Sequence, residues 1–240
     1  MIKLYPSISI LKGKVTRLTR GDYSQEKEYE KSPVDFARMF EDIGIEVIHL
    51  VDLEGAIKES PVAYHVLETI AGHTKLEIEF AGGVRTDGDI LKLFELGAKY
   101  IAISSVAAQD RELFTSWLFS YGREKISLSA DAADGKLMIK GWQKKTEIDL
   151  YEFITYFYDR GLQYFKVTDI TRDGTMVGPN FELYKELVEK FPNAKIFASG
   201  GVRSTDDIRK LEDAGVYAVI FGKAFYEGKL SLDDLKTFIK

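Results

Sequence analysis

The stretch LEIEFAGGVRTDGDILKLFELGAKYIAISSVAA at residues 76–108 recurs in altered form as AKIFASGGVRSTDDIRKLEDAGVYAVIFGKAF at residues 194–225. Gly82-Gly83-Val84-Arg85 matches Gly200-Gly201-Val202-Arg203, an offset of 200 − 82 = 118 residues in a chain of 240. Because this offset is almost half of the chain, the sequence predicts one half-unit used twice. Each copy places a glycine-rich turn after a buried strand, and such turns can cradle phosphate. Two of them predict a ligand with a phosphate group at each end.

The composition is typical of one globular domain. With 240 residues, 45% of them hydrophobic, the chain has the usual size of a closed barrel of alternating strands and helices. It contains no cysteine, which excludes disulfides and thiolate metal sites. The net charge of −5, with acids and bases mixed, argues against general nucleic-acid binding. Since neither a membrane span nor a signal peptide is recognisable, we expect a cytoplasmic protein.

Short apolar runs alternate with amphipathic stretches along the whole chain, and several runs are typical of strands covered on both faces. We expect a single α/β domain, residues 1–240, folded as a (β/α)8 TIM barrel from two half-barrels of about residues 1–121 and 122–240. The expected strands are Lys3–Ile10, Glu46–Asp52, Leu76–Ala81, Tyr100–Ser104, Ile126–Asp131, Tyr164–Asp169, Lys195–Ser199 and Ala218–Gly222. The expected helices include Val62–Ala71, Arg111–Tyr121, Leu150–Arg160, Phe181–Phe191 and Leu232–Ile239.

Two helix starts and two long loops complete the expected fold. Ser32-Pro33-Val34-Asp35 and Ser204-Thr205-Asp206-Asp207 each combine an N-cap serine with an acid at the third helical position. The longest expected loops, Lys12–Lys31 and Ala132–Ile148, follow the first and fifth strands, at equivalent places in the two halves. Long loops on this side of such a barrel usually close over the site.

Polar residues at the ends of the expected strands are the candidates for chemistry, since a barrel of this kind has its active face there. Asp131 ends the fifth strand, SLSAD, and a partly buried carboxylate there can act as general acid or base. The spacing alone is equally compatible with Asp131 acting only as a cap of the following loop. Thr168 can place a hydroxyl beside it. Asp52 and Asp169 end strands two and six, where each either orients a ligand or holds a neighbouring loop.

Two candidate phosphate cups combine the repeated glycines with later strand ends. Gly82-Gly83 with Ser104-Ser105 predicts the first cup, and Gly200-Gly201 with Gly222-Lys223 predicts the second. Glycine allows the backbone to approach a ligand closely, and free N–H groups at helix starts favour anions. One glycine pair is usually only a turn, but the recurrence after corresponding strands makes the phosphate interpretation much stronger.

The remaining polar and aromatic residues are less specific. The histidines, His49, His65 and His73, have no metal-ligand spacing, so we expect them in the core or on the surface. Trp142 lies in the polar loop KGWQKK, where it either covers a hydrophobic seam or stacks on a flat heterocycle. The loop charges that are either solvated or folded inward onto an anion are Arg17, Arg20, Lys144 and Lys145.

Characteristic motifs occur at nearly every strand end, in one order along the chain. They are PSIS at Pro6–Ser9, GKVTRLTRGDY at Gly13–Tyr23, HLVDLEGA at His49–Ala56, AGGVR at Ala81–Arg85, SAD at Ser129–Asp131, IKGW at Ile139–Trp142, TDITRDGT at Thr168–Thr175, ASGGV at Ala198–Val202 and IFGKAFYEG at Ile220–Gly228. With these motifs the whole chain resembles the phosphoribosylformimino-5-aminoimidazole carboxamide ribotide isomerase family of histidine biosynthesis. The resemblance implies a half-barrel duplication and an Amadori rearrangement of a bisphosphorylated ribotide, from aminoaldose to aminoketose, without cofactor or metal. We expect a monomer that binds this small molecule rather than nucleic acid or membrane.

The resemblance also assigns roles to individual residues. Asp131 matches the general acid that helps to open the ribose ring, Thr168 matches a supporting threonine, and Trp142 matches the loop aromatic that packs on the substrate. The residues expected to bind the substrate or its phosphates are Gly83, Arg85, Ser104, Ser105, Trp142, Asp169, Gly178, Gly200, Gly201, Gly222 and Lys223.

Ser9 departs from the pattern that the resemblance implies. The family begins with a strand ending Pro-Ala-Ile-Asp, whose aspartate is the general base that moves the C2′ proton, whereas this chain has Pro6-Ser7-Ile8-Ser9. A hydroxyl has no useful basicity near neutral pH, and loss of a general base costs about 10²–10⁴-fold in rate. We therefore expect impaired turnover. Ala81, where the family usually has a third glycine, is a smaller departure.

Three other functions are compatible with the sequence. A non-catalytic homologue would bind the ribotide without converting it. The sister cyclase of the same pathway shares the barrel and the phosphate cups and needs a glutaminase partner, although IKGW and HLVDLEGA favour the isomerase. In the third, Asp131 alone serves as both acid and base in an altered reaction.

Overall fold

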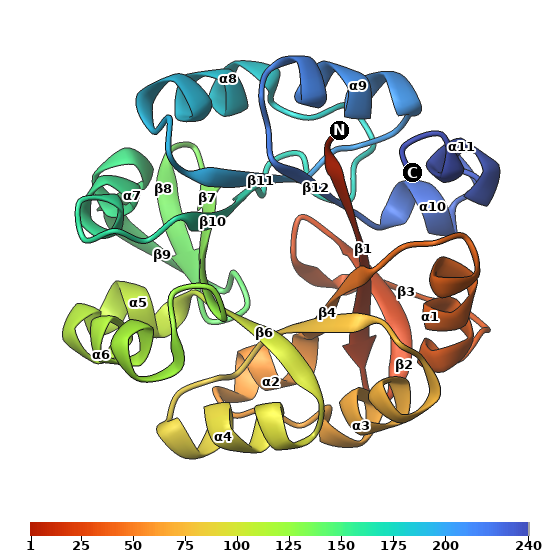
Figure 1. Cartoon of the computed structure of the whole chain (residues 1–240), viewed down its shortest axis with the longest axis horizontal. Coiled ribbons are helices and arrows are strands. Elements are labelled where there is room, and N and C mark those ends of the chain that lie inside the picture. Colours follow the sequence, from red (N-terminus) through yellow and green to blue (C-terminus); the bar gives the residue numbers. More distant parts are fainter. Residues whose placement is uncertain (240) are drawn as a thin grey trace.

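In the computed structural model, which describes residues 1–239, parallel strands close into a ring. Each strand pairs in parallel with the next one around the ring, and the first strand pairs with the last from Lys3↔Ala218 to Pro6↔Phe221. Figure 1 shows this ring end-on. Its eight strands are β1 (Lys3–Leu11), β4 (Val47–Asp52), β5 (Glu77–Ala81), β6 (Ala98–Ile103), β7 (Ile126–Ala133), β10 (Tyr164–Asp169), β11 (Lys195–Ser199) and β12 (Ala218–Phe221).

Helices form a layer around the ring and alternate with its strands along the chain (Figure 1). This alternation confirms the expected (β/α)8 barrel, and each expected strand range overlaps a strand of the ring. Within residues 1–239, no helix is long and apolar enough to cross a membrane. The helices are α1 (Pro33–Asp42), α2 (Leu53–Lys58), α3 (Tyr64–His73), α4 (Asp87–Glu95), α5 (Ser105–Gln109), α6 (Arg111–Tyr121), α7 (Leu150–Tyr158), α8 (Phe181–Lys190), α9 (Thr205–Asp213), α10 (Lys223–Tyr226) and α11 (Leu232–Lys236).

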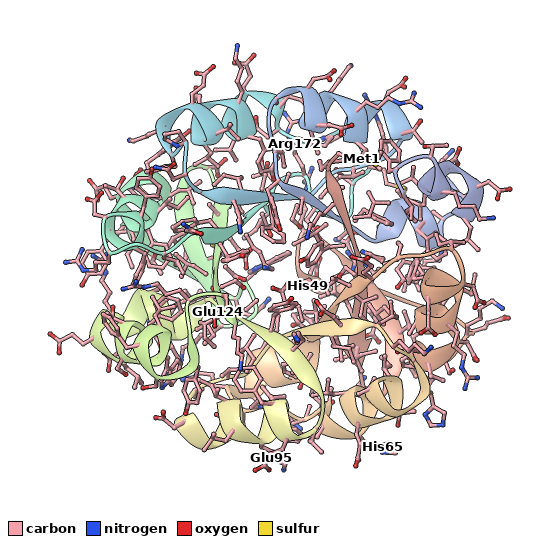
Figure 2. The ribbon with its side chains drawn as sticks, in the orientation of Figure 1. Met1, His49, His65, Glu95, Glu124 and Arg172 are labelled. Carbon is pink, nitrogen blue, oxygen red and sulfur yellow. The ribbon has the colours of Figure 1, made fainter. Side chains whose placement is uncertain are left out.

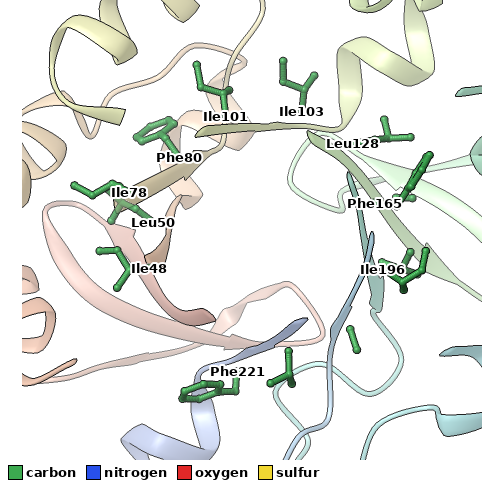
Figure 3. Close-up of a cluster of buried hydrophobic side chains, with 14 of the residues drawn as sticks. Ile48, Leu50, Ile78, Phe80, Ile101, Ile103, Leu128, Phe165, Ile196 and Phe221 are labelled. Atoms are coloured by element: carbon green, nitrogen blue, oxygen red, sulfur yellow. The ribbon is translucent and has the colours of Figure 1, made fainter. Parts of the chain in front are cut away.

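The main hydrophobic core lies between the ring and the helices. Side chains such as Ile48, Phe80 and Phe165 are fully buried and point outward from their strands (Figure 3). Successive side chains of a strand point to opposite faces, so the residues between these outward ones point into the ring. Burial of a large apolar side chain contributes about 1.5–3 kcal/mol, so the many side chains of this layer stabilise the barrel strongly.

The inside of the ring changes from apolar to polar along the strands. At their beginnings, a small separate cluster closes the barrel with Tyr5, Val47, Phe197, Ala218 and Ile220. Further along lie buried polar side chains, among them Ser7, Ser9, His49, Glu79, Ser127, Lys166 and Thr168. The barrel therefore has a closed apolar end and a polar interior that leads to the carboxyl-terminal ends of the strands.

The two expected loops are β-hairpins rather than irregular segments, and this part of the sequence interpretation was wrong. The first hairpin consists of β2 (Lys14–Thr19) and β3 (Asp22–Glu28), and the second of β8 (Lys136–Ile139) and β9 (Lys144–Asp149). Three of their connections are two-residue turns with both φ angles positive, which matches the twist of paired strands. These turns are Lys12-Gly13, Arg20-Gly21 and Asp134-Gly135.

Both expected helix starts are confirmed. The Ser32 side chain accepts from the backbone N–H of Asp35 in a full capping box, and the Ser204 side chain accepts from the N–H of Asp207. The sequence did not predict the short helices α2, α5 and α10. They have only four to six residues each, which is too short for a helical period to be visible.

Candidate active site

A pocket lies at the carboxyl-terminal mouth of the barrel, where the sequence analysis expects the site. Its lining unites the two halves of the chain, since both glycine pairs and polar residues of most ring strands contribute to it. Asp169 and Gly178 are the two predicted site residues outside the lining. The predicted site residues that line the pocket are Ser9, Gly83, Arg85, Ser104, Ser105, Asp131, Trp142, Thr168, Gly200, Gly201, Gly222 and Lys223.

Asp131 lies on β7 in the wall of this pocket, opposite Thr168 of β10 in the strand register. The indole Nε1–H of Trp142, from the turn of the second hairpin, donates to Asp131 Oδ2 at 3.0 Å. Burial raises the pKa of the Asp131 carboxyl, while hydrogen bonds from Trp142 and Thr168 and the nearby His49 lower it in part. A carboxyl with a raised pKa keeps its proton to higher pH, which suits a general acid.

Ser9 is buried on β1 and is engaged by a cation from the first hairpin. Arg17 Nη1 donates to Ser9 Oγ at 2.7 Å and to Ser7 Oγ at 3.1 Å. The Arg17 Nε–H is buried and has no hydrogen-bond partner among the described residues. Arg17 therefore folds into the mouth, which is one of the two positions that the sequence left open for it.

Asp173 is a pocket residue that the sequence analysis missed. It follows β10 in the TRDGT segment and lines the pocket together with Arg17 and Lys223. Burial raises the pKa of its carboxyl, the Asp131 charge adds to the rise, and Arg17 and Lys223 oppose it. The acidic residue beside a glycine in TRDGT was the available signal, but such a pair usually indicates only a turn.

The first glycine pair lies against the end of the neighbouring strand. A Cβ on Gly82 would be 2.3 Å from the carbonyl oxygen of Asp52, and a Cβ on Gly83 would be 2.7 Å from that of Gly55. Only glycine fits both positions, whose φ angles are +112° and +80°. Ser105, from the same cup, accepts at Oγ from the backbone N–H of Lys140 in the second hairpin at 3.0 Å.

The second glycine pair repeats this geometry. A Cβ on Gly200 would be 2.5 Å from the carbonyl oxygen of Asp169, which stands to Gly200 as Asp52 stands to Gly82. A Cβ on Gly222 would be 2.5 Å from Arg17 Cζ, so the guanidinium lies directly against this glycine. Lys223 Nζ donates to the hydroxyl of Thr19 at 2.7 Å. The second cup thus carries two cations, Arg17 and Lys223.

We expect Gly201→Ala to lower the free energy of unfolding by about 1–3 kcal/mol more than Gly135→Ala, the cost of forcing extra volume into a packed site. Both glycines have positive φ, but a Cβ on Gly201 would be 2.4 Å from the carbonyl oxygen of Gly178, whereas one on Gly135 meets nothing within 4 Å. Urea unfolding of the two variants measures the difference. Equal losses of unfolding free energy in the two variants would show that the second cup can accommodate a Cβ at Gly201 and does not require the close contact with Gly178.

Asp52 and Asp169 hold loops rather than line the pocket floor. Asp52 accepts from the backbone N–H groups of Gly55, Val62 and Ala63. Asp169 accepts from the N–H and hydroxyl of Thr171 and from the amide of Asn180. Both carboxylates therefore position the segments against which the glycine pairs pack, which is the loop-holding alternative of the sequence analysis.

The two hairpins meet over the mouth. A Cβ on Gly21 would be 2.7 Å from the Trp142 ring, and Gln143 Nε2 donates to the Gly21 carbonyl oxygen at 3.2 Å. Lys140 of the second hairpin pairs with Glu59 at 2.9 Å, next to Arg85, which pairs with the same carboxylate at 3.1 Å. The pocket is thus covered by residues from both halves of the chain.

The fold and this pocket define a (β/α)8-barrel protein with partly buried carboxylates at the mouth, where barrels of this kind carry their active sites. The model of the histidine biosynthesis protein family matches residues 3–231. The chain belongs to this family.

Full-length relatives share close to half of the sequence. The chain is 45% identical over 238 residues to a protein of Cytophaga hutchinsonii, covering 99% of both chains. It is 47% identical over 238 residues to one of Parabacteroides distasonis and 46% identical over 239 residues to one of Bacteroides thetaiotaomicron, covering 99–100% of each chain. All three relatives are named as 1-(5-phosphoribosyl)-5-((5-phosphoribosylamino)methylideneamino) imidazole-4-carboxamide isomerase.

Proposed function

We propose that this chain is the isomerase of histidine biosynthesis that its relatives are named for, acting on a ribotide with two phosphoribosyl groups. The reaction is an Amadori rearrangement of an aminoaldose to an aminoketose. The observation that carries the proposal is the position of Asp131 in one pocket with both glycine cups, one from each half of the chain. A ligand that has one phosphate in each cup would place the C1′–O bond of its ribose ring near this carboxyl.

In this proposal the reaction needs proton transfers only. The glycine cups hold the two phosphates, with Arg17 and Lys223 adding positive charge at the second cup. Asp131 donates the proton that opens the ribose ring, supported by Thr168. Trp142, released from its hydrogen bond to Asp131, packs on the ligand. Asp173 is a second carboxylate within the same pocket, which Arg17 and Lys223 also line.

We expect the purified protein to convert the aminoaldose to the aminoketose. Proton NMR checks this directly, because the signal of the single C1′ proton of the ribosyl amine is replaced by a pair of C1′ methylene protons. Saturable binding without conversion would identify a non-catalytic ribotide-binding protein. Consumption of the aminoketose in the presence of ammonia would identify the sister cyclase instead.

We also propose that the protein works in the cytoplasm, as a monomer, on a free small molecule. Asp131 and both glycine pairs lie in one pocket of the same chain, so the proposed chemistry calls on no residue of a second subunit. Sedimentation at the concentration of the activity assay tests the monomeric state.

A further inference from the structure

His49 lies on the wall of the pocket, although the sequence indicates only a core or surface residue. It is 9% exposed on β4, in register with Ser7 of β1 and Glu79 of β5. Figure 2 shows His49 near the middle of the ring, whereas His65 lies at the outer edge of the molecule. His49 is therefore the histidine of the three that a ligand in the barrel mouth can reach.

A buried carboxylate fixes the orientation of the His49 ring. His49 Nδ1 is 2.8 Å from Glu79 Oε2, on a residue that is 3% exposed. Because an ionised carboxylate only accepts hydrogen bonds, Nδ1 carries the proton of this contact. In the neutral ring the other nitrogen, Nε2, is then the acceptor. A base oriented by a hydrogen-bonded third group is the arrangement that proton-transferring histidines use.

Glu79, the partner of His49, belongs to a wider network of buried polar side chains. Glu79 also forms an ion pair with Lys166 and accepts from Ser127 Oγ at 3.2 Å, while Lys166 Nζ donates to Ser127 Oγ at 3.1 Å. The Lys166 ammonium lies 3.9 Å from the centre of the Phe197 ring. Glu79 therefore has a cationic partner, Lys166, in addition to its contact with His49. The charged groups around His49 are Glu79 on β5, Lys166 on β10 and Asp131 on β7.

We propose that His49 is the catalytic base of the isomerisation, with Glu79 as its positioning residue. The proposal rests on the function proposed above. His49 would supply the base that β1 lacks. The residue on that strand is Ser9, and its hydroxyl already accepts a hydrogen bond from Arg17 at 2.7 Å.

The proton transfers balance within the pocket. Asp131 protonates the ring oxygen as the C1′–O bond breaks, and the nitrogen lone pair forms a C1′=N iminium. His49 Nε2 takes the C2′ proton, and the electrons of that bond form C1′=C2′ while the iminium electrons return to nitrogen. The His49 imidazolium then gives its proton to C1′. The C2′ hydroxyl becomes a carbonyl and its proton restores Asp131.

The first test compares His49→Ala with His65→Ala, a matched change on the exposed face of α3. We expect His49→Ala to lower kcat by about 10²-fold or more, with KM within about threefold, and His65→Ala to leave both unchanged. Added imidazole should restore part of the turnover of His49→Ala and none of that of Asp131→Asn. A His49→Ala variant that is folded but keeps kcat, or that imidazole does not restore, overturns the proposal. If the unsubstituted protein does not isomerise the ribotide, the proposed function fails instead.

The second test needs no variant of the network. Nitrogen NMR of the three histidines in the intact protein should show His49 with a protonated Nδ1 and an unprotonated Nε2 near neutral pH. A ring with Nε2 protonated overturns the proposal whatever the activity. Ser9→Asp gives an independent result, because a carboxylate there would pair with Arg17. We expect less than about a tenfold gain in kcat, whereas a gain of about 10² would place the base on β1.

Discussion

Replacing Asp131 with asparagine is expected to lower kcat by about 10²–10⁴-fold, because the amide cannot supply the proton that opens the ribose ring. The Asn side chain keeps the shape of the carboxyl and can still accept from Trp142 Nε1, now 3.0 Å away. Ligand affinity should therefore stay within about tenfold, or about 1.4 kcal/mol. Steady-state kinetics with the ribotide and direct titration of ligand binding separate the two effects.

The dependence of kcat on pH shows whether Asp131 acts in its protonated form. Burial raises the pKa of Asp131, so its acid form persists further up the pH scale than that of an exposed aspartate, and activity should fall as pH rises through this pKa. Asp134→Asn is the matched control, since Asp134 is exposed in the adjoining turn and asparagine tolerates its φ of +51°. If Asp131→Asn keeps kcat within about threefold of the original, Asp131 is not the acid.

Replacing Glu79 with alanine is expected to lower the free energy of unfolding by about 3–5 kcal/mol, because it leaves the Lys166 ammonium buried without a negative charge beside it. Glu77→Ala, on the same strand, is the control. Glu77 pairs with Lys99 at 3.8 Å and accepts from the Tyr100 hydroxyl at 2.7 Å, both on a partly exposed surface, so we expect a smaller loss of about 1–2 kcal/mol there. Urea unfolding measures both. The double change Glu79→Leu with Lys166→Met should recover most of the loss, and failure to do so would mean that the ion pair itself is not the cause.

The ion pair of Glu79 with Lys166 also predicts how the free energy of unfolding depends on pH. Burial alone raises the pKa of Glu79, but Lys166 and His49 outweigh it and bring the pKa down to about 2 from an ordinary 4.5. A carboxyl with a depressed pKa in the folded state stabilises the fold above its unfolded pKa. This contribution is therefore complete above about pH 4.5 and is lost as pH falls toward 2. In Glu79→Ala that part of the acid dependence should disappear.

The sequence predicted the barrel because its signals are local or repeated. The repeated glycine pairs, the apolar strands and the N-cap serines each depend on a few neighbouring residues, and all of them lie where expected. The hairpins were missed because their strands, such as Asp22–Glu28, are polar on both faces. The dipeptides Lys12-Gly13 and Asp134-Gly135 were the usable signal, since X-Gly pairs favour two-residue hairpin turns.

The interior of the site could be predicted only in part. Asp131, Thr168 and Trp142 belong to motifs, but the contact of Arg17 with Ser9 and the network of Glu79 with Lys166 join residues from distant strands. A periodic pattern does not tell which strands face each other across a ring. A weaker signal was present, because each of the strands VIHLVD, EIEFA and YFKVTD carries a polar residue in the middle of an apolar run. Such a residue needs a buried partner.

The pairing of the first strand with the last also sets the order of events during synthesis. Lys3 of β1 lies beside Ala218 of β12, so at about 5–20 residues per second roughly 10–40 s pass on the ribosome before both strands exist. Throughout that interval β1 is an open edge that can pair with other nascent chains. Gly222 and Lys223 follow β12, and the second cup is therefore the last part of the pocket to emerge. Truncated chains that end before β12 should be prone to aggregation and unable to hold a ligand with two phosphates.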